Sequence, residues 1–91
     1  MSTKLNSIII SNNDLKRNKY SKEILINNID NLLLDNILVT QKLELDFVVK
    51  YILNDKYQTT SDEKNIDIPL VLQCQPHLKE SDIVFELSKI I

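Results

Sequence analysis

The sequence predicts a mainly α-helical fold, a small bundle of three to four helices preceded by a flexible N-terminal arm. Apolar residues recur at spacings of three and four in separate stretches. Polar residues suited to capping stand before these stretches, with acidic residues in the first turns. The length of 91 residues suits a single core. We therefore expect residues 1–20 to form the arm and residues 21–91 to form the helical domain.

The expected arm contains one apolar triplet, Ile8-Ile9-Ile10. Polar and basic residues surround it, and the cluster from Ser11 to Asp14 is typical of a turn, because these side chains compete for backbone hydrogen bonds. We expect a poorly ordered segment with one adhesive spot. A short strand near residues 7–10 is the alternative.

The first helix is expected over residues 21–38. Ser21 suits the N-cap, and Glu23 lies in the first turn, where the helix dipole favours a carboxylate. The apolar stripe is wide enough to touch two neighbours; it consists of Leu25, Ile26, Ile29, Leu32, Leu33, Leu34, Ile37 and Leu38.

The second helix is expected over residues 41–56, with Thr40 as its cap. Leu43, Phe47 and Tyr51 recur with helical spacing. Residues 43–47 also alternate as a strand would, but sixteen residues without a turn signal favour a helix.

Residues 57–65 form the most polar and least periodic segment, so a loop is expected there. Thr60 and Glu63 stand at the spacing of a capping box. No apolar run follows closely enough to support that motif.

Residues 66–74 fit two structures. Their alternation would place five apolar residues on one face of a strand, whereas Pro69 suits the first turn of a short helix. We favour the helix, because a strand here would need residues 8–10 as its partner. Two strands, near 7–10 and 66–74, would make the fold α+β.

The last helix is expected from Ser81, which serves as the cap, to the end of the chain. Asp82 lies in its first turn. Apolar residues on one side of it are Ile83, Val84, Leu87, Ile90 and Ile91.

The chain has no glycine, which excludes phosphate-binding loops and the strained nucleophile turn of hydrolases. Cys74 and His77 have the spacing of half a zinc site, but there is no second Cys or His to complete it. The carboxylates are best interpreted as helix-start charges and solvated faces. We therefore expect no catalytic site, no metal and no cofactor.

The formal net charge of -2 gives no global field that would attract nucleic acid or anionic lipid. No window approaches the roughly 20 consecutive apolar residues of a membrane span. The N-terminus lacks the apolar region of a secretory signal, and a lone cysteine is compatible with a reducing compartment. We expect an intracellular protein, cytoplasmic or nuclear.

Large Ile, Leu and Val side chains are abundant, while Ala, Gly and Trp are absent. A chain this short has difficulty burying so much apolar surface alone. We therefore expect a non-catalytic protein–protein interaction module, a small subunit of a hetero- or homo-oligomeric complex. Its expected partner-binding residues are Ile8, Ile9, Ile10, Leu34, Leu38, Ile90 and Ile91.

Two other functions remain open. A nucleic-acid-binding module would use the only basic cluster, which contains Lys16, Arg17, Lys19 and Lys22. Residues 68–74 and 81–91 would then resemble a helix-turn-helix, although its second helix is acidic. A small inhibitor or immunity-type protein would instead use the acidic pair Asp62-Glu63 against a basic target.

Overall fold

A computed structural model of the chain describes residues 8–90 and confirms the mainly α-helical fold. No residue in that range is in a strand. The α+β alternative is therefore wrong for residues 8–10 and 66–74. The elements are α1 (Asn12–Arg17), α2 (Lys22–Asn27), the 3-10 turn η2 (Ile29–Asn31), α3 (Leu34–Thr40), α4 (Leu45–Phe47), the π-helical turn η3 (Val48–Ile52), α5 (Ser61–Lys64), α6 (Ile68–Cys74) and α7 (Glu80–Ile90).

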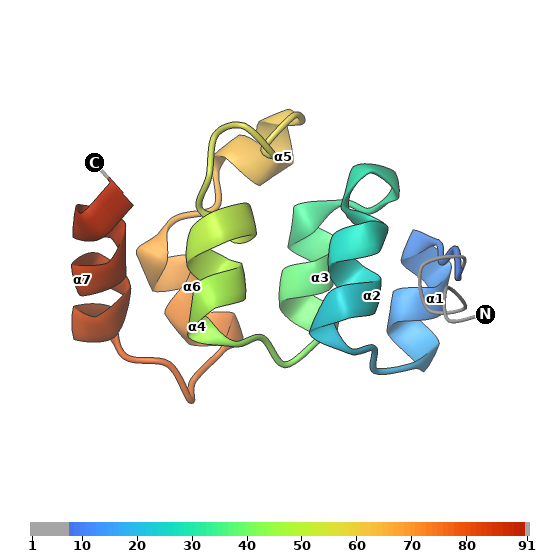
Figure 1. The fold of residues 1–91 in the computed structure, drawn as a ribbon, viewed down its shortest axis with the longest axis horizontal. Coiled ribbons are helices and arrows are strands. Elements are labelled where there is room, and N and C mark those ends of the chain that lie inside the picture. The colour runs from blue at the N-terminus through green and yellow to red at the C-terminus, as the bar shows by residue number, and fades with distance from the viewer. Residues whose placement is uncertain (1–7, 91) are drawn as a thin grey trace.

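The helices form a row of three antiparallel pairs, with α1 and α7 at opposite ends (Figure 1). The first pair is α1–α2, the second is α3 with α4 and η3, and the third is α6–α7. The first helix of each pair contacts the first helix of the next pair, α1 with α3 and α3 with α6. Among the second helices, α7 contacts α4 and η3. The main contacts between pairs are therefore between neighbouring pairs, as in a helical solenoid.

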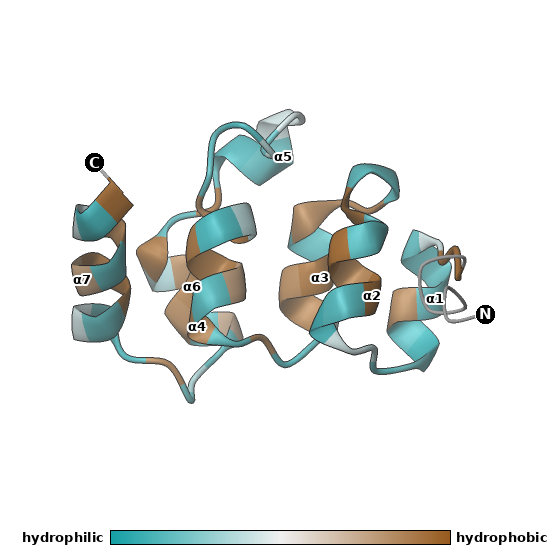
Figure 2. Cartoon of the chain, viewed as in Figure 1, coloured by the Kyte–Doolittle hydropathy of each residue, from teal (hydrophilic) through white to brown (hydrophobic). Residues whose placement is uncertain are grey.

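The pairs share a common register. The fourth residue of each second helix is buried: Leu25, Val48 and Ile83 are 2%, 0% and 0% exposed. Four residues connect the helices within the first and second pairs, and five connect α6 to α7. The apolar colouring of Figure 2 is densest in the middle of the row, whereas α5 is hydrophilic. The core thus runs through all three pairs.

Side-chain caps begin α1, α2, α5 and α6. Ser21 accepts a hydrogen bond from the amide of Ile24, as expected from the sequence. Thr60 and Glu63 form a complete capping box at the start of α5, so the sequence-based rejection of that motif was wrong. Asp67 caps α6, and Pro69 lies in its first turn, where a missing amide hydrogen costs nothing.

The helical fold begins earlier than the boundary expected at residue 20. Ser11 and Asp14 form a capping box that starts α1, and Leu15 is only 1% exposed. The cluster from Ser11 to Asp14, interpreted as a turn, is the helix start instead, because the capping bonds satisfy the orphan amides of that helix. Residues 1–7 of the expected arm lie outside the described residues.

The helix expected over residues 21–38 is divided, and the one expected over 41–56 is shortened to α4 and η3. Asn28 ends α2, and α3 starts only at Leu34. Thr40 is the last residue of α3 and does not cap the next helix, which Glu44 precedes. The final helix begins at Glu80, one residue before the expected cap. The apolar periodicity is continuous across the first break, which is why it did not reveal that break.

A buried glutamine joins the second pair to the first. Gln41 follows α3 and is 4% exposed. Its side-chain nitrogen donates to the carbonyls of Leu15 at 3.1 Å and Asn18 at 2.9 Å. Its side-chain oxygen accepts from the amide of Tyr20 at 2.8 Å. One side chain thus satisfies three backbone groups in the α1–α2 connection.

Gln75 repeats this bridge between the third pair and the second. It follows α6 and is 2% exposed. Its nitrogen donates to the carbonyls of Leu38 and Gln41, at 2.8 and 2.7 Å, and its oxygen accepts from the amide of Leu43 at 2.8 Å. Leu38, Gln41 and Leu43 occupy the same places in the second pair as Leu15, Asn18 and Tyr20 in the first.

The connection between the second and third pairs is held by Glu63, which is 2% exposed. Its carboxylate accepts hydrogen bonds from the amides of Leu34, Thr59 and Thr60 at 2.8 to 2.9 Å, and from the Thr59 hydroxyl. Burial raises the pKa of the Glu63 carboxyl, but the hydrogen bonds outweigh it and hold the pKa below its ordinary value. Glu63 is therefore a buried anchor and carries charge at neutral pH.

Candidate interaction surface

Helix α7 exposes three large apolar side chains. Val84, Phe85 and Ile90 are 48%, 60% and 63% exposed. Successive helical residues are turned by about 100°, so the burial of Ile83 directs Phe85 almost directly away from the core. Isolated exposed apolar residues are common, but Val84 and Phe85 are neighbours on the outer side of this helix and form a candidate contact surface, whereas Ile90 lies on the side of Ile83, near the end of the helix.

Phe85 has a charged neighbour on the same helix. The Lys89 ammonium lies 4.6 Å from the centre of the Phe85 ring, and it also pairs with Glu86 at 3.1 Å. An aromatic ring with a cation on its face and an ion pair beside it has the composition of an interface anchor with a polar rim.

An apolar pocket adjoins the C-terminal end of α7. It has a volume of about 370 Å³, and its lining includes Val49 and Leu53 from the second pair and Leu87 and Ile90 from α7. Asn54 and Asp55 close its polar side. The exposed Ile90 side chain thus stands at the border between the pocket and the outer surface of α7.

The isoleucine triplet lies at the opposite end of the row. Ile9 is 79% exposed and Ile8 is 38% exposed, whereas Ile10 is 5% exposed and belongs to the core. The buried side chain of Asn28 holds the segment: it accepts from the amide of Ile10 at 3.0 Å and donates to the carbonyl of Ile8 at 3.0 Å. Ile8 and Ile9 are accessible, and Ile10 is not.

Two other residues expected at the surface are buried. Leu34 and Leu38 are each 1% exposed, so the expectation that they form an accessible edge is wrong. The break between α2 and α3 lets both side chains turn into the core, where the neighbouring helix pairs cover them. Ile91 lies outside the described residues.

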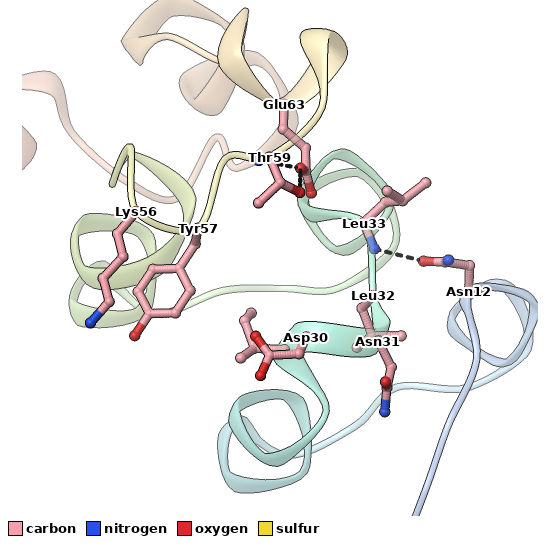
Figure 3. A pocket seen from close by; sticks show the side chains of 10 residues that line it. Asn12, Asp30, Asn31, Leu32, Leu33, Lys56, Tyr57, Thr59 and Glu63 are labelled. Atoms are coloured by element: carbon pink, nitrogen blue, oxygen red, sulfur yellow. Dashed lines mark hydrogen bonds between the residues drawn. The ribbon is translucent and has the colours of Figure 1, made fainter.

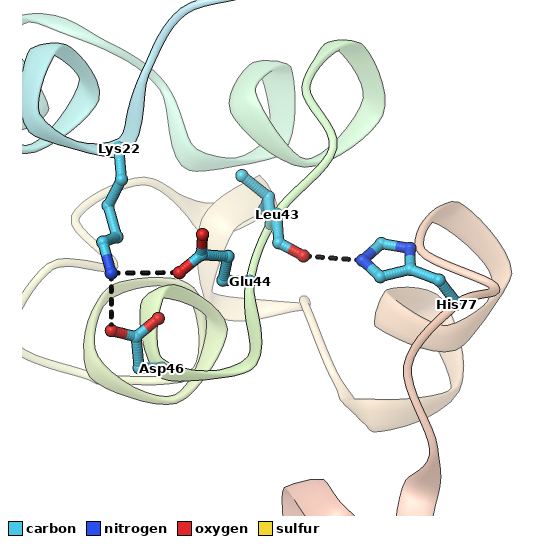
Figure 4. Close-up of polar contacts among 5 residues, drawn as sticks. All are labelled: Lys22, Leu43, Glu44, Asp46 and His77. Carbon is cyan, nitrogen blue, oxygen red and sulfur yellow. Dashed lines mark hydrogen bonds and ion pairs between the residues drawn. The ribbon is translucent and has the colours of Figure 1, made fainter.

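The basic cluster is divided by the fold. The Lys22 ammonium binds two carboxylates, Asp46 at 2.9 Å and Glu44 at 3.0 Å (Figure 4). The hydrogen bonds to Asp46 and Glu44 raise the pKa of Lys22, and the bond from Lys22 lowers the pKa of Asp46. Lys19 donates to the carbonyl of Thr40. These contacts join the first pair to the second.

Lys16 and Arg17 are exposed on α1. They make no ion pair with another residue of the described range. Two cations therefore remain uncommitted from the four expected to contact nucleic acid, which leaves a small electrostatic footprint.

A small pocket of about 190 Å³ separates the first pair from the loop that follows η3 (Figure 3). Asp30, Lys56 and Tyr57 are on its wall. Glu63 also borders it, but its carboxylate is fully engaged with backbone amides and Thr59. The acidic pair proposed for an inhibitor is thus reduced to Asp62.

Cys74 and His77 lie on one open pocket of about 380 Å³. The His77 side chain bonds through Nε2 to the carbonyl of Leu43 at 2.6 Å (Figure 4). Within the described part of the chain, no group of three or more His, Cys, Asp or Glu residues could hold a metal ion. The arrangement offers neither a metal site nor a positioned third group for a cysteine nucleophile.

Sequence reasoning missed Phe85 and Val84 as surface residues. The sequence pattern grouped Val84 with the other apolar residues on one side of the last helix and gave Phe85 no role. A large aromatic residue on the side opposite Ile83 was the available signal.

No protein-family model, curated protein or solved structure matches this chain. None of the helices in residues 8–90 is long and apolar enough to cross a membrane.

Proposed function

We propose that this chain is a non-catalytic protein–protein interaction module that contacts its partner through the outer surface of α7. The observation that carries the proposal is the exposure of the neighbouring side chains Val84 and Phe85, at 48% and 60%, on the outer side of that helix. Aromatic residues with an adjacent cation are frequent energetic centres of interfaces. The role would be that of a small subunit in a complex, located inside the cell.

The alternatives have less support. Nucleic-acid binding would rest on Lys16 and Arg17, because Lys22 is paired with two carboxylates and Lys19 donates to the Thr40 carbonyl. An inhibitor acting through Asp62 and Glu63 would lose its second carboxylate to the core. We therefore retain the protein–protein role as the proposal.

The proposal is tested by photo-crosslinking in cells of the source organism. Benzoylphenylalanine replaces Phe85 in one variant and Lys50 in the control, because Lys50 is exposed and occupies the same place in the second pair. We expect a discrete protein adduct from position 85 and none from position 50. The adduct should disappear when Val84→Glu is added.

Two outcomes would contradict the proposal. One is the absence of any adduct at position 85. The other is the same set of adducts at both positions, which would indicate random encounters.

A further inference from the structure

The second pair has apolar residues that the third pair covers. The third pair carries similar apolar residues at the equivalent positions. Leu38, Val49 and Ile52 of the second pair are 1%, 5% and 0% exposed, and the third pair packs beside them. The equivalent residues of the third pair are Leu72, Val84 and Leu87. Leucine, valine and a large aliphatic residue thus recur at the same three places.

These equivalent residues differ in burial. Val84 is 48% exposed where Val49 is 5% exposed, and Leu72 and Leu87 are only partly buried. Among residues 8–90, a third pair lies against the second, whereas no further helix pair lies against the third. Their chemistry therefore matches a surface that takes another helix pair.

The third pair also repeats the backbone groups to which the bridging glutamine binds. Gln75 binds the carbonyls of Leu38 and Gln41 and the amide of Leu43. The equivalent groups one pair further along are the carbonyls of Leu72 and Gln75 and the amide of His77.

Two of these three groups are open. Pro76 has no amide hydrogen to give to the Leu72 carbonyl, and the His77 amide has no hydrogen-bond partner among residues 8–90. The Gln75 carbonyl accepts from Leu78 at 3.0 Å and keeps a second lone pair. One carboxamide could satisfy the set, as Gln75 does in the second pair.

The α1–α2 pair at the other end of the row lacks the side chains that such a helix pair would need. Two apolar core residues recur at matching places in the inner first helices: Leu34 and Ile37 in α3, and Ile68 and Val71 in α6. The matching places in the first pair hold Ser11, the N-cap of α1, and Asp14, which bond to each other in the capping box. Ile8 and Ile9 are exposed just before them, but at these two places a second copy of this chain would present polar, already bonded side chains where the inner pairs present apolar ones.

We propose, on the basis of the interaction role given above, that the outer face of α6–α7 binds a helix pair of the same form in a partner protein. The first helix of that pair would end in Gln or Asn, whose carboxamide bonds Leu72, Gln75 and His77. Its aliphatic side chains would cover Leu72, Val84 and Leu87.

The test supplies such a helix pair by fusion. The probe is the full chain followed by a second copy of residues 54–91, which carries its own α6–α7 pair and connection. Solvent access is measured as the rate of thiol labelling of Val84→Cys in a Cys74→Ser background. We expect the added segment to slow labelling by about tenfold or more and to raise the Tm of the single transition by about 5 °C or more.

Two controls make the result specific. Val39→Cys, 65% exposed on α3, should label at the same rate with and without the added segment. Replacing, in the added segment, the glutamine that corresponds to Gln75 with Met should restore much of the Val84→Cys rate.

Unchanged labelling of Val84→Cys in the fusion, or a separate transition for the added segment, would overturn the proposal. So would concentration-dependent protection of Val84→Cys in the natural chain, which would identify a second copy as the occupant. Crosslinking at position 85 would still stand in that case, so failure of this inference is distinguishable from failure of the interaction role.

Discussion

The two ends of the row have opposite character. At the α1 end, Ser11 and Asp14 stand where the inner pairs have Leu34 and Ile37, and their side chains bond to each other. At the α7 end, Leu72 and Val84 stand where the second pair has the buried Leu38 and Val49. A terminal unit with a polar outer face closes a helical stack. Within residues 8–90, the contrast is between polar side chains at these places beside α1 and apolar side chains at the matching places of α6–α7.

The largest expected loss of stability comes from truncating Leu38, on the face of the second pair that the third pair covers. Leu72 is its equivalent on the open face of the third pair. Leu38→Ala should lower the free energy of unfolding by about 4 kcal/mol, because Leu38 is 1% exposed and the substitution leaves a cavity. Leu72→Ala should cost about 1 kcal/mol, because its site is partly open to solvent. Urea denaturation of both variants measures the difference, and equal costs would break the comparison.

The next largest loss of stability is expected from replacing Gln75, which bridges the second and third pairs. Gln75→Met keeps the side-chain length but leaves the carbonyls of Leu38 and Gln41 and the amide of Leu43 without a partner. We expect a loss of about 3 kcal/mol. Gln73→Met is the matched control, since Gln73 is exposed on the same helix and should change stability by less than about 0.5 kcal/mol. A Gln75 effect as small as the control would remove the bridge from the account.

The anchor of the connecting loop gives a smaller, pH-dependent effect. Glu63→Gln should cost about 2 kcal/mol at pH 7, because a charged acceptor of backbone amides is lost. The folded-state pKa of Glu63 is depressed. Its stabilisation is therefore complete above the ordinary glutamate pKa of about 4.3 and is lost as the pH falls through the lower folded-state value.

Unfolding measured from pH 7 to pH 3 checks this sign. The difference between the natural chain and Glu63→Gln should shrink as the pH falls. A difference that grows toward acid pH would show that burial, and not hydrogen bonding, controls the carboxyl.

The smallest effect is expected at the surface ion pairs between the first two pairs. Lys22→Met removes the contacts to Glu44 and Asp46, which lie in solvent and are screened by salt. The variant should melt slightly below the natural chain at low ionic strength and together with it at high salt. A loss that persists in high salt would instead indicate packing of the Lys22 side chain.

The sequence predicted the helical class and several helix starts because those depend on local patterns. Ser21 and Pro69 are examples, since capping and first-turn preferences act within a few residues. The break between α2 and α3 was not predictable from periodicity, because Leu32 and Leu34 keep the apolar pattern through it. The structure of that region depends on hydrogen bonds between residues far apart in the sequence. Asn28 bonds to Ile10, 18 positions earlier, and Glu63 bonds to Leu34, 29 positions earlier.

The candidate surface was predictable in part. Ile9 and Ile90 were expected to be exposed and are. Leu34 and Leu38 were not distinguishable from surface residues, because their burial depends on which neighbouring pair covers each side of α3. Phe85 was missed because an aromatic side chain on the outer side of a helix looks unremarkable until the helix is seen to have no neighbour on that side.

The central claim is that the outer face of the third pair matches a covered face of the second and stands open. Thiol labelling of Val49→Cys and Val84→Cys in a Cys74→Ser background tests it most directly, since the residues occupy equivalent places at 5% and 48% exposure. The account predicts rapid labelling of Val84→Cys and labelling of Val49→Cys only at the rate at which the chain opens. Equal rates at the two sites under native conditions would contradict it.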